Sequence, residues 1–212
     1  MKVMMLNGSW NPSGSTGAGL KIMAKVFAQQ GIETETFCLG TKPVQDCIAC
    51  GKCGELKRCV FDTDAVNGFA KKAQDADGFV FGTPVYYAHP SGRILSVLDR
   101  VFFSSRGPDG KWRFQHKPAA AIVVARRGGT ATAYDVMNKY FGISNMIAVG
   151  STYWNNFHAL SPDEVPKDAE GVQTLENIAL NMSWLIKCLK AGREAGIPLP
   201  ELRTGAVTNF VR

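Results

Sequence analysis

Four cysteines lie close together in the chain and are the residues best suited to redox or metal chemistry. They are Cys47, Cys50, Cys53 and Cys59, with the spacing C-x2-C-x2-C-x5-C. Three thiols so near one another suit a cuboidal iron–sulfur cluster, because its irons need thiolates from one tight wrap of backbone. Structural zinc more often uses two separated C-x-x-C pairs. Plain thiols are the remaining interpretation, since four cysteines are necessary for a cluster but not sufficient.

A group of hydroxyl side chains follows the short apolar run 2–6, which predicts a strand buried on both faces of a parallel sheet. The hydroxyls belong to Ser9, Ser13, Ser15 and Thr16, set among glycines that let the backbone approach an anion. A helix expected from about Thr16 adds its positive end. The stretch has neither the Walker Gly-Lys-Ser/Thr nor the G-x-G-x-x-G fingerprint. We therefore expect a phosphate loop of another kind, with an ordinary strand-to-helix turn as the alternative.

This loop resembles that of the flavodoxin-like FMN proteins, whose reductase branch carries G-S-P-R-x-x-G-N-T where this chain has G-S-W-N-P-S-G-S-T. The matching positions are Gly8, Ser9, Gly14 and Thr16. Ser15 replaces the usual Asn, and Trp10-Asn11 replace Pro-Arg. The resemblance implies FMN-binding residues in this loop, namely Ser9, Asn11, Ser15 and Thr16. The cysteine spacing is similar to that of the iron–sulfur flavoproteins, which implies a [4Fe-4S] cluster, although many relatives keep such cysteines as thiols.

The segment 83–92, T-P-V-Y-Y-A-H-P-S-G, resembles the T-P-x-Y-x-x-x-x-S-G turn with which FMN reductases hold the flavin. Pro84 stiffens the turn, and the rings of Tyr86 and Tyr87 can lie against the flavin or shield it. Backbone amides can reach its polar edge. Two core or interface tyrosines are the alternative. The residues that the resemblance assigns to the flavin are Thr83, Pro84, Val85, Tyr86 and Tyr87.

A glycine-rich loop with two arginines follows the expected buried strand 119–125. In the family this loop passes the pyrimidine edge of the flavin, which implies contacts from Ala125, Arg126, Gly128 and Gly129. Arg126 and Arg127 can stabilise negative charge on the reduced flavin or meet a nicotinamide nucleotide phosphate. Arginines that simply face solvent are the alternative.

The aromatic segment 151–158, S-T-Y-W-N-N-F-H, follows the last expected strand and can form a roof over the flavin where substrate stacks. His158 and His89 are candidate proton donors, although a lone loop histidine is more often a plain hydrogen-bonding residue. No catalytic residue is assigned outright, because hydride and electron chemistry belongs to the flavin. The catalytic candidates are Arg126, Arg127 and His158.

The elements that must position these residues form five β/α units. Strands are expected at 2–6, 33–39, 78–82, 119–125 and 145–150. Helices are expected at about 16–30, after a cap at Asp62 or Thr63, from Ser91, through 133–140, and through 175–189. The fold class is α/β, a doubly wound, five-stranded parallel sheet of order 2-1-3-4-5, flavodoxin-like. Residues 1–198 form one domain with the cysteine-rich loop 47–59, and 199–212 form a tail. A surface loop at 103–117, with Trp112 and Phe114, is expected to meet another subunit.

The composition excludes several classes of protein. The 212 residues carry a net charge of +6 without a basic block, so nucleic-acid binding is not expected. No apolar run reaches membrane-spanning length, and no signal peptide pattern opens the chain, so we expect a cytoplasmic protein without a membrane partner. Six cysteines in a reducing compartment favour metal or redox chemistry over disulfides. The charge also suits an enzyme that receives nicotinamide nucleotides better than an acidic carrier.

The resemblance implies an FMN-dependent oxidoreductase that transfers electrons from NAD(P)H, or from a reduced partner, to a small acceptor. FAD is not expected, because no motif accommodates its second phosphate and adenosine. A non-enzymatic one-electron carrier served by ferredoxin is the alternative, and a module that binds some other phosphate ligand is a third. The family resemblance favours a homodimer or homotetramer.

Overall fold

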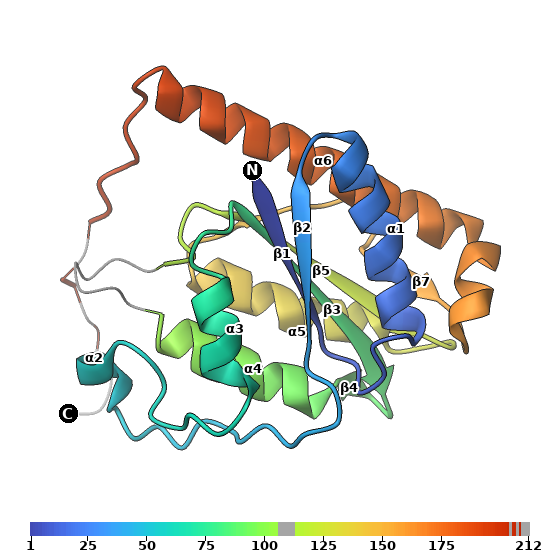
Figure 1. The fold of residues 1–212 in the computed structure, drawn as a ribbon, viewed down its shortest axis with the longest axis horizontal. Helices are drawn as coiled ribbons and strands as arrows, with labels where there is room; N and C mark the ends of the chain where they lie inside the picture. Colours follow the sequence, from blue (N-terminus) through green and yellow to red (C-terminus); the bar gives the residue numbers. More distant parts are fainter. Residues whose placement is uncertain (106–112, 204, 207, 209–212) are drawn as a thin grey trace.

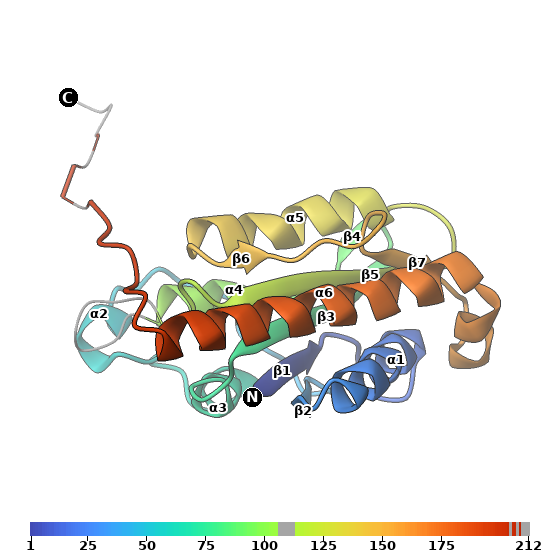
Figure 2. The same cartoon turned by 90° about the horizontal axis from the view of Figure 1, so that it is seen from above.

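The computed structural model describes residues 1–105, 113–203, 205, 206 and 208. Its strands are β1 (Lys2–Asn7), β2 (Glu33–Cys38), β3 (Gly78–Tyr86), β4 (His89–Pro90), β5 (Pro118–Ala125), β6 (Ile147–Ala148) and β7 (Asn156–His158). Its helices are α1 (Ser15–Gln29), α2 (Cys53–Leu56), α3 (Ala65–Lys72), α4 (Gly92–Phe103), α5 (Thr130–Ile143), the 3-10 helix η1 (Pro162–Lys167) and α6 (Ala169–Glu194). One sheet lies between two helix layers, with α1 and α6 on one face and α3, α4 and α5 on the other (Figures 1 and 2).

The main sheet has the order β2-β1-β3-β5-β6, and all of these neighbours are parallel. Counting only the five expected strands, this is the order 2-1-3-4-5, so the predicted doubly wound fold is confirmed. The short β4 pairs antiparallel with the end of β3. In such a sheet the carboxyl ends of β1, β3 and β5 meet at one edge, where open α/β folds bind ligands.

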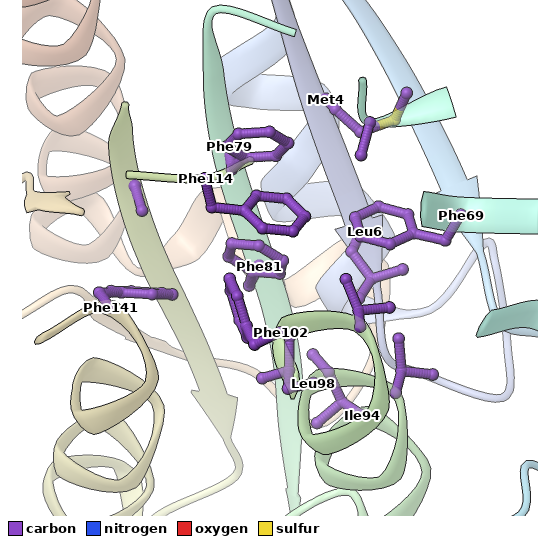
Figure 3. Close-up of a cluster of buried hydrophobic side chains, with 14 of the residues drawn as sticks. Met4, Leu6, Phe69, Phe79, Phe81, Ile94, Leu98, Phe102, Phe114 and Phe141 are labelled. Carbon is purple, nitrogen blue, oxygen red and sulfur yellow. The ribbon is translucent and has the colours of Figure 1, made fainter. Parts of the chain in front are cut away.

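The core explains why these runs become strands. Alternate residues of β1 enter opposite cores: Met4 and Leu6 face α3 and α4, whereas Val3 and Met5 face α1 and α6. On the first face an aromatic cluster surrounds Phe81 (Figure 3). Ring centroids lie 5.0 Å apart for Phe79 and Phe114, 4.9 Å for Phe102 and Phe114, and 5.4 Å for Phe81 and Phe141. Each such pair adds about 0.5–1.5 kcal/mol beyond burial, so α4 is held firmly against β3.

The last strand differs from its prediction. Instead of one strand over 145–150, two short pieces, β6 and β7, pair with the two ends of β5. Between these two pairings β5 advances four residues, from Ala119 to Val123. The segment that pairs with it advances eight, from Ala148 to Asn156. The extra residues leave the sheet as a bulge. Buried Asn155 closes it, because its carbonyl accepts from Val123 N at 3.1 Å and its side-chain amide donates to Val149 O at 3.0 Å.

Smaller differences concern element ends and one loop. The cap of α3 is Asp64, whose Oδ1 accepts from Val66 N at 3.2 Å, and not Asp62 or Thr63. Phe114, expected on an exposed loop, is buried in the aromatic cluster. Trp112, expected on the same loop, lies outside the described residues. Within the described ranges, no helix combines the length and the apolar character needed to cross a bilayer.

Candidate functional site

Three segments predicted to hold a ligand come together at one edge of the sheet. β1 and β3 end side by side, with Asn7 opposite Gly82, and β3 and β5 end side by side, with Pro84 opposite Val124. The loop after β1, the β3–β4 hairpin and the loop after β5 are therefore neighbours (Figure 1). This part of the sequence prediction, that the segments share one end of the sheet, is confirmed.

The loop after β1 is built around the buried Asn7 and the half-buried Asn11. Asn7 Oδ1 accepts from Ser9 N at 3.0 Å, and Ser9 Oγ accepts from Asn11 N at 3.2 Å. Asn11 Oδ1 then accepts from Ser13 N at 3.0 Å, and Asn11 O accepts from Gly14 N at 3.1 Å. Asn11 thus shapes the loop from within. Where Arg would supply a charge at this position in the resembled motif, Asn11 supplies local structure.

The helix α1 begins directly behind this loop with its amides available. Its N-cap is Gly14, the first turn contains no acidic residue, and among the described residues no side-chain oxygen caps it. Thr16 is buried and Ser15 is half-buried in that first turn. Gly17, which sequence reasoning missed, is required for the close fit, because a Cβ there would lie 2.1 Å from Pro12 O. An uncapped helix start behind a hydroxyl loop is a favourable place for an anion.

The predicted Thr83 turn is a hairpin, because β3 continues to Tyr86 and pairs with β4. Thr83 is fully buried: its Oγ1 accepts from Ser91 N at 3.0 Å and its hydroxyl donates to Pro84 O at 3.0 Å. Ser91 Oγ donates to Gly8 O at 2.8 Å and accepts from Ile94 N at 3.3 Å. Thr83 and Ser91 therefore hold the hairpin, α4 and the phosphate loop in register.

The two tyrosines sit at the tip of this hairpin. Tyr87 is fully exposed and has a φ of +57°, a left-handed conformation that costs energy in a bulky residue. Tyr86 is 42% exposed, and its hydroxyl lies 3.4 Å from Ser9 Oγ. Neither ring is a core residue, so a core role for the two tyrosines is wrong, and an interface role is not tested. The hairpin instead places Tyr86 beside the loop after β1 and exposes Tyr87 to solvent at its tip.

The arginine loop lies against the other side of the hairpin. Gly129 has a φ of +93°, and a Cβ there would lie 3.0 Å from Val85 Cγ1, so this position requires glycine. Arg126, Arg127 and Gly128 are exposed. Gly129 is also the N-cap of α5, where among the described residues no side chain caps the helix. Two guanidinium groups and a helix start thus face solvent at the ligand edge.

Beyond this loop lies a hollow of about 620 Å³ at the β7 edge. Tyr153 and Trp154 line it from the bulge, with ring centroids 5.3 Å apart. His158 pairs with Ala125, and its backbone N–H donates to Asp168 Oδ2 at 2.6 Å. The imidazole Nδ1 lies 3.8 Å from that oxygen, too far for a hydrogen bond. The aromatic segment therefore lines a hollow beside the arginine loop. Sequence reasoning expected all of 151–158 to be a loop after the last strand, but its end forms the strand β7.

Acidic residues from α6 complete this hollow and were missed by sequence reasoning. Asp168 caps α6 through Gly171 N at 2.9 Å, and Glu170 and Thr174 also line the space. Asn156 Nδ2 donates to Thr130 Oγ1 at 3.1 Å and so ties β7 to the start of α5. His89, the other candidate proton donor, is exposed on the hairpin opposite Tyr86.

The four cysteines line a separate hollow of about 350 Å³, part of it open to solvent. Cys47 and Cys50 are exposed, Cys53 is half-buried at the start of α2, and Cys59 is buried. The hollow lies at the far end of α4, beside Phe103, and α2 stands well apart from β4 in Figure 1. The twelve-residue α4 spans about 18 Å between the phosphate loop and the cysteines.

The four thiols match an iron–sulfur cluster in donor type and number. Among the described residues, no three Cys, His, Asp or Glu side chains converge on one point as a zinc ion requires. A cuboidal cluster places each thiolate on a different iron, so its ligands are more widely spaced. Burial raises the pKa of the Cys53 thiol, and negative charge on Cys50, Cys47 and Cys59 raises it further.

A buried arginine stands behind the cysteines. Asp99 accepts a hydrogen bond from the Tyr140 hydroxyl at 2.5 Å. Arg100 donates through Nε to Cys59 Sγ at 3.1 Å and forms a buried ion pair with Asp64. The guanidinium thus touches one of the four candidate ligands, which no local sequence signal indicates.

Comparisons of the sequence with known proteins give one family match and similar iron–sulfur flavoproteins. A family model described as NADPH-dependent FMN reductase matches residues 1–159. The chain is 30% identical over 197 residues to an iron–sulfur flavoprotein of Methanocaldococcus jannaschii, which covers 90% of this chain and 100% of that one. It is 24% identical over 196 residues to an iron–sulfur flavoprotein of Methanosarcina thermophila, covering 92% and 100%.

Among solved structures, a flavodoxin from the domain Archaea superposes with a TM-score of 0.59 at 12% identity, covering 88% of this chain and 99% of that chain. At this identity the likeness shows the fold alone. It is the flavodoxin-like fold that the strand order predicts. Together with the family match across three quarters of its length, this means that the chain belongs to the NADPH-dependent FMN reductase family.

Proposed function

We propose that this oxidoreductase binds FMN, takes electrons from NAD(P)H and passes them to a small acceptor, with a [4Fe-4S] cluster at the four cysteines as its second redox group. The observation that carries the proposal is the meeting of an uncapped helix start, a hydroxyl loop and an exposed aromatic hairpin at one sheet edge. Bound FMN would accept a hydride as two electrons and release them singly.

The phosphate of FMN is proposed to lie against Ser9, Ser15 and Thr16. The α1 amides and these hydroxyls donate to it, and Gly17 lets the loop close tightly on the helix. Asn11 holds the loop in shape. No neighbouring lysine is required, because the helix start and the hydroxyls supply the donors.

The ring system is proposed to lie between the Tyr86–Tyr87 hairpin and the arginine loop. Pro84 and Val85 give the hairpin its direction, while the backbone of Ala125, Gly128 and Gly129 borders the opposite side. Support comes from the contact of Gly129 with Val85, which brings these two walls together. Thr83 is proposed to shape the hairpin and not to bond to the flavin through its hydroxyl, because that hydroxyl already donates to Pro84 O and accepts from Ser91 N.

Arg126 and Arg127 are proposed to receive the phosphates of the nicotinamide nucleotide. Both are exposed at the ligand edge, and a guanidinium matches phosphate geometry in a bidentate manner. The hollow behind them, lined by Tyr153, Trp154 and His158, is proposed to hold an aromatic acceptor. Aromatic walls with a few polar groups are typical of such pockets.

Electron transfer between the two redox groups is proposed to cross a subunit interface. Within one chain the length of α4 separates the Tyr86–Tyr87 hairpin, where the ring system is proposed to lie, from the cysteines, and tunnelling slows steeply with distance. Ile48, Leu56 and Phe103 are exposed around the cysteine hollow, as expected for an apolar contact with a second copy of the chain. A homodimer or homotetramer would bring one chain's cysteines near another chain's flavin edge.

A one-electron carrier reduced by ferredoxin is the alternative, favoured by the accessibility of Cys47 and Cys50. The two functions are distinguished by mixing the FMN-loaded protein, without oxygen, with NADH, NADPH or reduced ferredoxin. Bleaching of the flavin absorbance by a nicotinamide nucleotide, at a rate no slower than turnover with that nucleotide, supports the function as an NAD(P)H-dependent enzyme. Bleaching by ferredoxin alone would overturn it in favour of the carrier.

A further inference from the structure

The guanidinium of Arg100 is buried, and each of its three nitrogens has a partner. The residue is 2% exposed on α4. Its Nη1 donates to Gln45 O at 2.9 Å and to Asp64, its Nη2 donates to Phe61 O at 3.1 Å, and its centre lies 5.5 Å from the Phe61 ring. The third nitrogen, Nε, lies 3.1 Å from Cys59 Sγ. Because each nitrogen of the planar guanidinium is hydrogen-bonded, the group cannot rotate freely, and its Nε–H stays directed at the Cys59 sulfur.

Asp64 balances the charge of Arg100 inside the protein. Its Oδ1 caps α3, and its Oδ2 accepts from Gln45 N at 3.1 Å as well as from Arg100. Burial alone would raise the pKa of the Asp64 carboxyl, but the Arg100 bond and these backbone bonds hold that pKa below its ordinary value. The pair is therefore ionised and close to neutral overall, while the Nε–H dipole still faces the sulfur.

Cys59 is the best-fixed of the four cysteines. Asn67 clamps its backbone, because Cys59 N donates to Asn67 Oδ1 at 3.1 Å and Asn67 Nδ2 donates to Cys59 O at 3.0 Å. Its sulfur meets Arg100. Cys47 and Cys50, by contrast, are exposed. One ligand is therefore held in place before any cluster arrives.

We propose that Arg100 is a positioning residue for the cluster: it fixes the Cys59 sulfur as the anchoring ligand and raises the cluster's reduction potential through the Nε–H···S bond. The inference rests on the proposed cluster. A donor that bonds to a ligating sulfur draws negative charge away from the irons, so it stabilises the reduced state more than the oxidised state.

A purely structural arginine would behave differently. Its bonds to Gln45 O, Phe61 O and Asp64 would tie the segments before and after the cysteines to α4, and their loss would lower stability and iron content together. The Nε–H···S bond adds an electronic effect. This effect changes the potential of a cluster that is still fully assembled, whereas the loss of those ties alone does not.

Two variants separate these roles. Asp64→Asn keeps one of the two acceptor oxygens, places an amide NH2 where the other was and removes the balancing charge, so Arg100 becomes a net cation beside the cluster and the potential rises. Asp64→Asn combined with Arg100→Met removes the bond and both charges without leaving an unpaired buried ion, so the potential falls below that of the wild type. Arg58→Met is the matched control, because Arg58 adjoins Cys59 in sequence but is half exposed and bonds to the Cys59 carbonyl. Its potential stays at the wild-type value.

The proteins are reconstituted with iron and sulfide without oxygen, assayed for iron, and reduced stepwise with dithionite and mediator dyes while the reduced cluster is followed by electron paramagnetic resonance. The proposal is supported if, at wild-type iron content, the reduction potential rises in Asp64→Asn and falls in the double variant. Potentials that stay unchanged or move in the same direction overturn it. If the double variant does not fold, a potential that fails to rise in Asp64→Asn overturns it alone. A wild type that binds no iron overturns the proposed cluster as well, so the two failures are distinguishable.

Discussion

Replacing Thr16 with Val tests whether the hydroxyl loop holds the phosphate of FMN. Thr16 is 2% exposed in the first turn of α1, and a Cβ at Gly82 would lie 2.9 Å from its methyl group, so the methyl fills this space. Valine keeps that methyl and the side-chain volume. The variant should therefore fold normally and lose only a hydroxyl donor.

The loss should weaken FMN binding by about 1.5–3 kcal/mol, the scale for a hydrogen bond to a charged group. At about 1.4 kcal/mol per factor of ten, the dissociation constant should rise roughly 10-fold to 150-fold. The assay is a titration of deflavinated protein with FMN, followed by quenching of flavin fluorescence. Thermal unfolding of the flavin-free variant checks that its fold is intact.

Ser13→Ala is the matched control from the same loop. Ser13 is exposed, and its contribution to the loop is a backbone N–H that alanine retains. Its dissociation constant should stay near the wild-type value. An unchanged constant for Thr16→Val, or an equal weakening in both variants, would show that the phosphate lies elsewhere.

Three further predictions concern the rest of the site. Replacing Arg126 and Arg127 with Ala should raise the Michaelis constant for NAD(P)H and flatten its dependence on salt; unchanged kinetics at low and high ionic strength would argue against nucleotide binding there. Trp154→Ala should raise the Michaelis constant for aromatic acceptors and leave FMN content intact, and a selective loss of FMN would instead place this ring at the flavin. Cys50→Ala should abolish iron binding with FMN retained, whereas Cys188→Ala, an exposed cysteine outside the hollow, should keep both; iron retained in Cys50→Ala would exclude it as a ligand.

The sequence predicts the sheet well because the strongest signals are local. β1, β3 and β5 are continuous apolar runs, and glycine and hydroxyl residues follow them, so both the strand order and the shared ligand edge could be predicted. The cysteine motif is equally local, and its four members do line one hollow.

What could not be predicted depends on contacts distant in sequence. The bulge in the last strand is visible only when its pairing with β5 is known, since Asn155 closes it against Val123 and Val149. Thr83 matches a ligand-binding motif, yet its hydroxyl serves Ser91 eight residues later. Arg100 lies 41 residues from Cys59, so only the fold brings its Nε to that sulfur.

The position of the cysteine hollow is another property of the fold alone. A loop that follows β2 starts at the ligand edge, and sequence order gives no reason for it to end at the opposite end of α4. The structure takes this loop past α4 to α2 (Figure 1). That path is why the proposed electron route needs a second chain.

The most direct test of the central claim is the cofactor content of protein purified and reconstituted without oxygen. The account predicts one FMN and about four irons per chain, with a broad absorbance near about 400 nm beneath the flavin bands. FAD in place of FMN, or a colourless protein after reconstitution with FMN, would contradict it.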